Sequence, residues 1–220
     1  MDDKARVSRI IDVLSREYPD ARTALDFSSP LEMMVATQLS AQCTDKRVNM
    51  VTPALFKKYK TAKDYANADV KKFEQEIRST GFYHNKAKNI IAMAKMLVKD
   101  FSGKMPDTME ELIMLPGVAR KTANVVLNNA FHRSEGIAVD THVLRLSERL
   151  GLSKHGKDAV KVEQDLMRIV PRDKWGKFTY YIVDHGRSVC DAKKPKCPEC
   201  VISAYCPSKL YFMKKFYGKM

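Results

Sequence analysis

Apolar residues recur at helical spacing along nearly the whole chain, and this pattern limits the folds open to it more than any other feature. The first expected helix carries a single apolar face, made of Val7, Ile10, Ile11 and Leu14, and Tyr18–Pro19 ends it. Ser29–Pro30 starts a second helix. The same periodicity predicts helices over 45–59, 69–79, 85–101, 108–114, 120–131, 142–150, 158–169 and 174–188. Since no segment alternates apolar and polar residues as a strand does, we expect an all-α fold, with the loop 132–136 as the internal boundary.

The charge balance favours a polyanionic partner. Lysine and arginine number 39 against 26 acidic residues, a net charge of +13. Nucleic acid is the commonest partner of such a protein, although a basic protein without one has the same composition. No apolar run is long enough to span a bilayer, and the N-terminus lacks the layout of a signal peptide. We therefore expect an intracellular protein, of the cytoplasm and nucleoid, with reduced thiols and no membrane partner.

Four of the five cysteines form a compact metal-ligand pattern. Cys190, Cys197, Cys200 and Cys206 are separated by six, two and five residues. Four thiolates in one short loop suit either tetrahedral zinc or an iron–sulfur cluster, and spacing alone does not choose between them. Cys43 lies far away in the sequence, and we expect it to be a buried or partly buried free thiol.

Two short helices joined by a tight turn are expected over 108–131, and the second of them carries a lysine of chemical interest. Thr108 is a cap for a short helix, Leu115–Val118 breaks it, and a second helix begins near Ala119. Free amides at the start of that helix suit a phosphate, although an ordinary helical corner explains the turn equally well. Lys121 lies in the first turn, where the dipole, together with an expected partial burial, favours the neutral amine needed for attack on a sugar. A phosphate-contacting lysine is the alternative.

Asp140 precedes the next helix at the position of an N-cap. Capping alone is a complete explanation for an aspartate there. The cap would nonetheless leave one carboxylate oxygen available for chemistry. We assign the nearby His142 to packing or capping.

Three motifs together resemble the endonuclease III family of DNA glycosylases, a helix-hairpin-helix group with an iron–sulfur loop. They are the segments 115–123 and 139–143 and the cysteine spacing, and the resemblance extends over roughly residues 5 to 207. It implies that Lys121 is the nucleophile, that Asp140 supports it, and that the four cysteines hold a [4Fe-4S] cluster. It also implies a phosphate grip by the backbone at the hairpin, with a monovalent cation when DNA is bound, at Leu115, Gly117, Val118 and Ala119.

The resemblance further implies residues that open and track the duplex. Gln42 would fill the gap left by a flipped nucleotide, and Phe82 would act as a wedge. Lys193, Lys194 and Lys196 would contact the DNA backbone. Two positions depart from the family: Ala119 replaces a common glycine, for which we expect helical angles, and Phe82 replaces a common aliphatic residue.

The implied architecture is two helical domains, 22–133 with the hairpin and 1–21 plus 134–220 with the cluster. The implied activity is excision of oxidised pyrimidines from duplex DNA by a bifunctional glycosylase and AP lyase that cuts 3′ to the abasic site by β-elimination. We expect a monomer bound to damaged double-stranded DNA. The alternatives are a monofunctional adenine or mismatch glycosylase, a non-catalytic DNA-binding protein, and a zinc-bearing variant of the latter.

Overall fold

The computed structural model describes residues 2–218, and every regular element within them is a helix. The predicted all-α fold is therefore confirmed. Among the described helices, none combines the length and apolar character needed to cross a bilayer. The chain divides into two compact units, one formed by Thr23–Glu135 and the other by the described residues up to Arg22 and from Gly136 onward.

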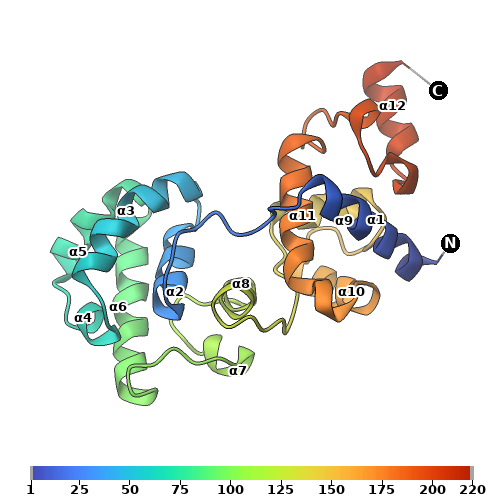
Figure 1. Cartoon of the computed structure of the whole chain (residues 1–220). Coiled ribbons are helices and arrows are strands. Elements are labelled where there is room, and N and C mark those ends of the chain that lie inside the picture. Colours follow the sequence, from blue (N-terminus) through green and yellow to red (C-terminus); the bar gives the residue numbers. More distant parts are fainter. Residues whose placement is uncertain (1, 219–220) are drawn as a thin grey trace. The chain divides into compact units, whose positions relative to one another are not determined.

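The continuous unit is organised around one long helix (Figure 1). Its elements are α2 (Pro30–Leu39), α3 (Asp45–Lys58), α4 (Ala62–Ala66), α5 (Val70–Ile77), η1 (Arg78–Thr80), α6 (Tyr83–Asp100), α7 (Met109–Leu112) and α8 (Arg120–Ala130). The central helix α6 packs against α4 and α5, while α2 packs against α8. Tyr65 and Phe73 are fully buried between these helices with their rings edge to face. Burial of this apolar surface is the main term that stabilises the unit.

Short elements account for most differences from the expected helices. The five-residue helix α4 was not expected, because so short a segment carries little periodicity. A capping box fixes it instead, in which Thr61 and Asp64 satisfy each other's backbone amides. The helix expected over 108–114 shrinks to α7, because the chain turns from Ile113 onward.

The discontinuous unit joins the first helix to the second half of the chain. Its elements are α1 (Asp3–Glu17), α9 (Thr141–Arg149), α10 (Ala159–Ile169), η2 (Arg172–Lys174), α11 (Trp175–Ser188), η3 (Cys197–Glu199), η4 (Ser203–Tyr205) and α12 (Lys209–Tyr217). Helix α11 packs against both α1 and α9. Its inner face carries Phe178, Ile182 and the buried His185. This helix therefore connects the hydrophobic core to the cysteine loop that follows it.

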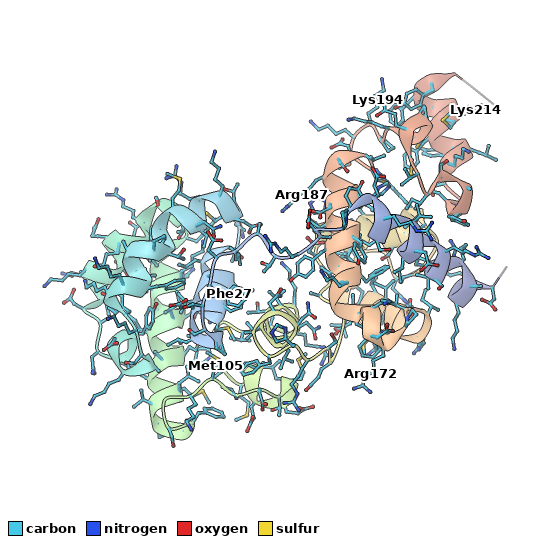
Figure 2. All side chains as sticks on the ribbon, in the orientation of Figure 1. Phe27, Met105, Arg172, Arg187, Lys194 and Lys214 are labelled. Atoms are coloured by element: carbon cyan, nitrogen blue, oxygen red, sulfur yellow. The ribbon has the colours of Figure 1, made fainter. Side chains whose placement is uncertain are left out.

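Helix α12 follows the last cysteine and packs on the cysteine loop, although none of its described residues is fully buried. Phe212 lines the pocket formed by that loop, and the Tyr217 hydroxyl donates to the Pro195 carbonyl at 3.0 Å. Figure 2 shows Lys194 beside this helix, with its ammonium 5.4 Å from the centre of the Tyr217 ring. The tail is ordered because its aromatic side chains find partners elsewhere in the unit.

Candidate functional site

The turn between α7 and α8 has the backbone geometry of a tight hairpin. Gly117 adopts a φ of 76°, and a side chain there would meet Asn89 at 2.9 Å, so glycine is required for both reasons. Ala119 is the N-cap of α8 with φ −96° and ψ 167°. The expectation of helical angles at Ala119 is thus wrong, because a cap residue is extended. Any residue adopts these angles, so the turn does not need a second glycine.

The start of α8 is suited to an anion. Ala119 has no side-chain acceptor and makes no capping hydrogen bond. The amides of the first turn have no partner within the helix, and the helix dipole adds positive potential there. Backbone groups of the hairpin can therefore hold a phosphate without reading a base.

A buried glutamine of α2 donates a hydrogen bond to the hairpin, and the sequence analysis did not identify it. Gln38 is 6% exposed, and its Nε2 donates to the Pro116 carbonyl at 3.2 Å. In the described structure its Oε1 has no hydrogen-bond partner. The signal was an amide within an otherwise apolar, buried stretch of α2.

Lys121 is the second residue of α8 and its side chain is exposed. Its predicted place in the first turn is correct, directly after the hairpin. The expectation of partial burial is wrong, because only residues from Ala123 onward begin the buried face of the helix. Exposure leaves the amine accessible to a large substrate.

Asp140 caps α9 as predicted. A single oxygen, Oδ1, accepts from the backbone amides of His142 and Val143, both at 2.8 Å. These two bonds fix the carboxylate, while Oδ2 takes part in neither. The His142 ring lies against Gly186 and Arg145, and burial lowers its pKa.

Gln42 and Phe82 lie on neighbouring turns of the continuous unit. Both side chains are exposed, and both residues adopt left-handed backbone angles, with φ of 53° and 48°. Such angles are uncommon for residues other than glycine, and they persist only where the surrounding structure imposes them. Both residues line one pocket of about 250 Å³, together with Asn85, Lys86 and Gly117. Gln42, Phe82 and the hairpin residue Gly117 therefore line the same pocket.

The four cysteines surround one pocket of the discontinuous unit. Cys190, Cys197, Cys200 and Cys206 all line it, alongside apolar side chains that include Phe212. Within residues 2–218, no three histidine, cysteine or acidic side chains converge closely enough to hold a single metal ion. Four thiols that line one pocket suit either a zinc ion or an iron–sulfur cluster. Burial raises the pKa of the Cys200 thiol to about 11 and also that of Cys206, so a cationic centre is needed to keep them as thiolates.

Two residues that the sequence analysis did not single out hold the cysteine loop in place. Arg149, at the end of α9, donates to the carbonyls of Asp191 and Ala192 at 2.7 and 2.8 Å and approaches the Cys190 sulfur at 3.3 Å. His185 is buried with its Nε2 3.4 Å from the Cys200 sulfur. Neither residue carries a local sequence signal, because its partners lie at least 15 positions away.

The lysine loop is exposed and its backbone is fixed. Lys193, Lys194 and Lys196 are all exposed between the first two cysteines. The Asp191 carboxylate accepts from the amides of Lys193 and Lys194 at 2.7 and 3.2 Å, and these bonds lower its pKa. The loop therefore presents cations on a preformed backbone.

The expected site residues fall into two groups. The hairpin, Lys121, Gln42 and Phe82 belong to the continuous unit, and the cysteines, Asp140 and the lysine loop belong to the other. The structure places each of these residues, corrects the expectations at Ala119 and Lys121, and leaves their functional roles as predictions.

Known proteins resemble the chain over most of its length. Residues 35–172 match the HhH-GPD superfamily base excision DNA repair protein model. An endonuclease III of Synechocystis sp. is 51% identical over 93% of each chain, and that of Bacillus subtilis is 44% identical over 89% of each chain. A solved non-covalent endonuclease III–DNA complex matches with a TM-score of 0.90 and 41% identity, over 97% of this chain and all of that one. A thermostable thymine-DNA glycosylase, at 21% identity and a TM-score of 0.85, shares the fold.

Proposed function

Because the chain belongs to the HhH-GPD superfamily of base excision DNA repair proteins, and is a DNA glycosylase and AP lyase of the endonuclease III type, we propose that Lys121 is its nucleophile. The observation that carries this proposal is the place of Lys121, exposed in the first turn of α8 directly behind the hairpin. A phosphate held by the hairpin would fix the register of damaged duplex DNA beside this amine. An amine attacks carbon through its lone pair, which an exposed side chain can bring to a bound substrate.

In the proposed reaction, the lone pair of Lys121 Nζ forms a bond to C1′ of the damaged nucleotide. The bond from C1′ to the base breaks, and the base leaves with that electron pair and takes up a proton. The sugar ring then opens to a protonated Schiff base between C1′ and Nζ. Loss of a proton from C2′ expels the 3′ phosphate by β-elimination, and water then releases the amine. One residue thus performs base removal and strand cleavage.

Asp140 is proposed to stabilise the positive charge that develops on the sugar as the base departs. Two amide hydrogen bonds to Oδ1 hold the carboxylate and leave Oδ2 for this task. Charge stabilisation by a group that is already oriented needs no reorganisation during the reaction.

The other predicted residues would help to flip the damaged nucleotide and would contact the DNA backbone. We propose that Gln42 enters the space left by the flipped nucleotide, since an amide both donates to and accepts from an orphaned base. Phe82 would stack against the neighbouring bases as a wedge. The lysine loop would add salt-dependent contacts to the backbone. Hairpin carbonyls would hold a monovalent cation when DNA is bound, and chromosomal DNA would place the enzyme at the nucleoid.

The four cysteines are proposed to hold a [4Fe-4S] cluster. All four cysteines line one apolar pocket, which supports a single shared metal centre, and their spacing resembles that of the family's cluster loop. When bound, the cluster would link Cys190 and Cys197 to the other two cysteines and so fix both ends of the lysine loop. Arg149 and His185 would orient the loop and exclude water from one side of it. Iron and sulfide analysis with the visible absorption of the purified protein tests this directly, and zinc in place of iron would contradict it.

Borohydride trapping tests the nucleophile. Duplexes carrying thymine glycol, 5-hydroxycytosine, uracil, or adenine opposite guanine are incubated with wild type, Lys121→Gln and Lys104→Gln, the last being an exposed lysine of the same unit. We expect wild type and Lys104→Gln to give a covalent adduct on the oxidised pyrimidines, and Lys121→Gln to give none. Base release without an adduct would mean a monofunctional enzyme. Binding without base release would mean a non-catalytic protein.

A further inference from the structure

A buried lysine links the two turns that carry Gln42 and Phe82. Lys86 is only 6% exposed although lysine is among the residues least often buried. Its Nζ donates to the carbonyl of Leu39 at 2.7 Å and to the carbonyl of Thr80 at 2.8 Å. Leu39 is the last residue of α2, three positions before Gln42, and Thr80 is the last residue of η1, two positions before Phe82. One ammonium group therefore joins the bases of both turns.

The backbone of Lys86 makes a third connection to the same region. Its amide donates to the Phe82 carbonyl at 3.1 Å, as the first hydrogen bond of α6. Phe82 itself is a left-handed N-cap without a capping side chain, so the start of α6 depends on its neighbours. Lys86 lies on the buried face of α6, one turn before Ile90. Its side chain is thus anchored in the longest helix of the unit.

Burying the charged ammonium of Lys86 costs free energy, because the group loses its contacts with water. Among the described residues, no carboxylate pairs with Lys86, and its Nζ donates to two neutral carbonyls. Burial lowers the pKa of Lys86, which expresses that cost. Both carbonyls end a helix, where a cation is favourable and where the carbonyls would otherwise lack donors. The ammonium is suited to holding two helix ends at a fixed separation.

We propose that Lys86 is a positioning residue that sets the spacing between Gln42 and Phe82, so that both enter the DNA stack together. The inference rests on the proposed roles of those two residues. Lys86 lines the pocket of about 250 Å³ between them, beneath the hairpin glycine Gly117. Since a displacement of about 1 Å can cost on the order of 10²-fold in rate, a fixed spacing matters for a lesion that must be flipped.

Lys86→Met tests the proposal, because methionine fills nearly the same volume without charge or donors. The matched control is Lys88→Met, an exposed lysine of the same helix. Base release is measured under single-turnover conditions on duplex DNA carrying thymine glycol. Borohydride trapping is measured on a single strand with an abasic site, which needs neither flipping nor gap filling. Hydrogen exchange is followed at residues 41–43 and 81–83.

We expect Lys86→Met to lose on the order of 10²-fold on the duplex, to trap within about threefold of wild type on the single strand, and to exchange faster in both turns. Lys88→Met should match wild type throughout. Equal losses on both substrates, or unchanged exchange in the turns, would overturn the proposal. If wild type traps on neither the single strand nor a duplex with the same abasic site, the proposed nucleophile is wrong, while the exchange data still decide the role of Lys86.

A second variant and a double-mutant cycle guard against a folding defect. Lys86→Gln keeps an amide donor and should recover part of the duplex rate if the donors position the turns. Adding Lys86→Met to a chain that already carries Gln42→Ala and Phe82→Ala should cost less than about threefold, because residues acting through shared partners are not additive. Full additivity would show that Lys86 acts through something other than these turns.

Discussion

Asp140 caps α9, and substitutions can separate this cap from the proposed role of its carboxylate in the reaction. As a cap, Oδ1 accepts two amide hydrogen bonds, from His142 and Val143, at 2.8 Å each. At about 1 kcal/mol net per bond, Asp140→Ala should cost about 2 kcal/mol, the upper end for an N-cap. A chain of this size then melts roughly 4–8 °C lower. Asp140→Asn retains a carbonyl acceptor, and asparagine caps about as well as aspartate, so its melting temperature should stay near that of wild type.

The rate of base release in the Asp140 variants should depend on whether the side chain is charged, and not on the melting temperature of the variant. Both variants lose the carboxylate, so base release should fall by roughly 10²–10³-fold in each, the usual range when one group that stabilises transition-state charge is removed. The measurement pairs thermal unfolding with single-turnover release on duplex DNA carrying thymine glycol. Asp140→Ser, a neutral residue that also caps, serves as the second control.

The pattern across variants decides between the two roles. If Asp140→Asn keeps the wild-type rate, the charge has no part in the reaction and Asp140 is a cap alone. If Asp140→Ala unfolds at the wild-type temperature, the two hydrogen bonds do not stabilise α9 as argued. Only a stable, inactive Asp140→Asn agrees with both roles.

Three further substitutions test other parts of the structure. Gly117→Ala should weaken DNA binding about tenfold or more in a titration at fixed salt, because its φ of 76° and its close neighbour strain a side chain, whereas Ala119→Gly should bind within about twofold of wild type. Phe212→Ala should speed loss of iron to a chelator, followed by visible absorption, because the ring lines the cysteine pocket, and the exposed Leu210→Ala should not. Hydrogen bonds from a serine and a histidine lower the pKa of Asp165, so its contribution to stability exists above about pH 4 and disappears as the pH falls below that. Asp165→Asn should therefore lower the melting temperature at pH 7 and not at about pH 2; equal shifts at both values would contradict this reasoning.

Most of the fold could be predicted because helix formation depends on interactions between residues that are close in sequence. Helical periodicity and caps are properties of neighbouring residues, so the starts of α2 at Pro30 and of α9 at Thr141 were within reach of the sequence. The hairpin was predictable for the same reason, since Gly117 and the break at Pro116 are local signals.

The missed features depend on partners distant in sequence. Helix α12 is ordered by Phe212 and Tyr217 packing on a loop, which its basic composition does not indicate. Arg149 gains its role only when the cysteine loop folds over the end of α9. Lys86 did leave a signal, because it shares the apolar stripe of Ile90 and Leu97, where a lysine is out of place.

The interrupted course of the chain through its two units has a consequence for biosynthesis. Thr23–Glu135 is one uninterrupted segment, so it can fold as soon as it leaves the ribosome. Helix α1 is made earlier, yet its core partners on α9 and α11 follow only after that whole segment. Its apolar face, with Val7 and Leu14, must stay uncovered in the meantime, which exposes the nascent protein to chaperones and proteases. Slow translation anywhere between Glu17 and Ser188 should therefore prolong this exposure and reduce yield, whereas slow translation after Ser188 should not.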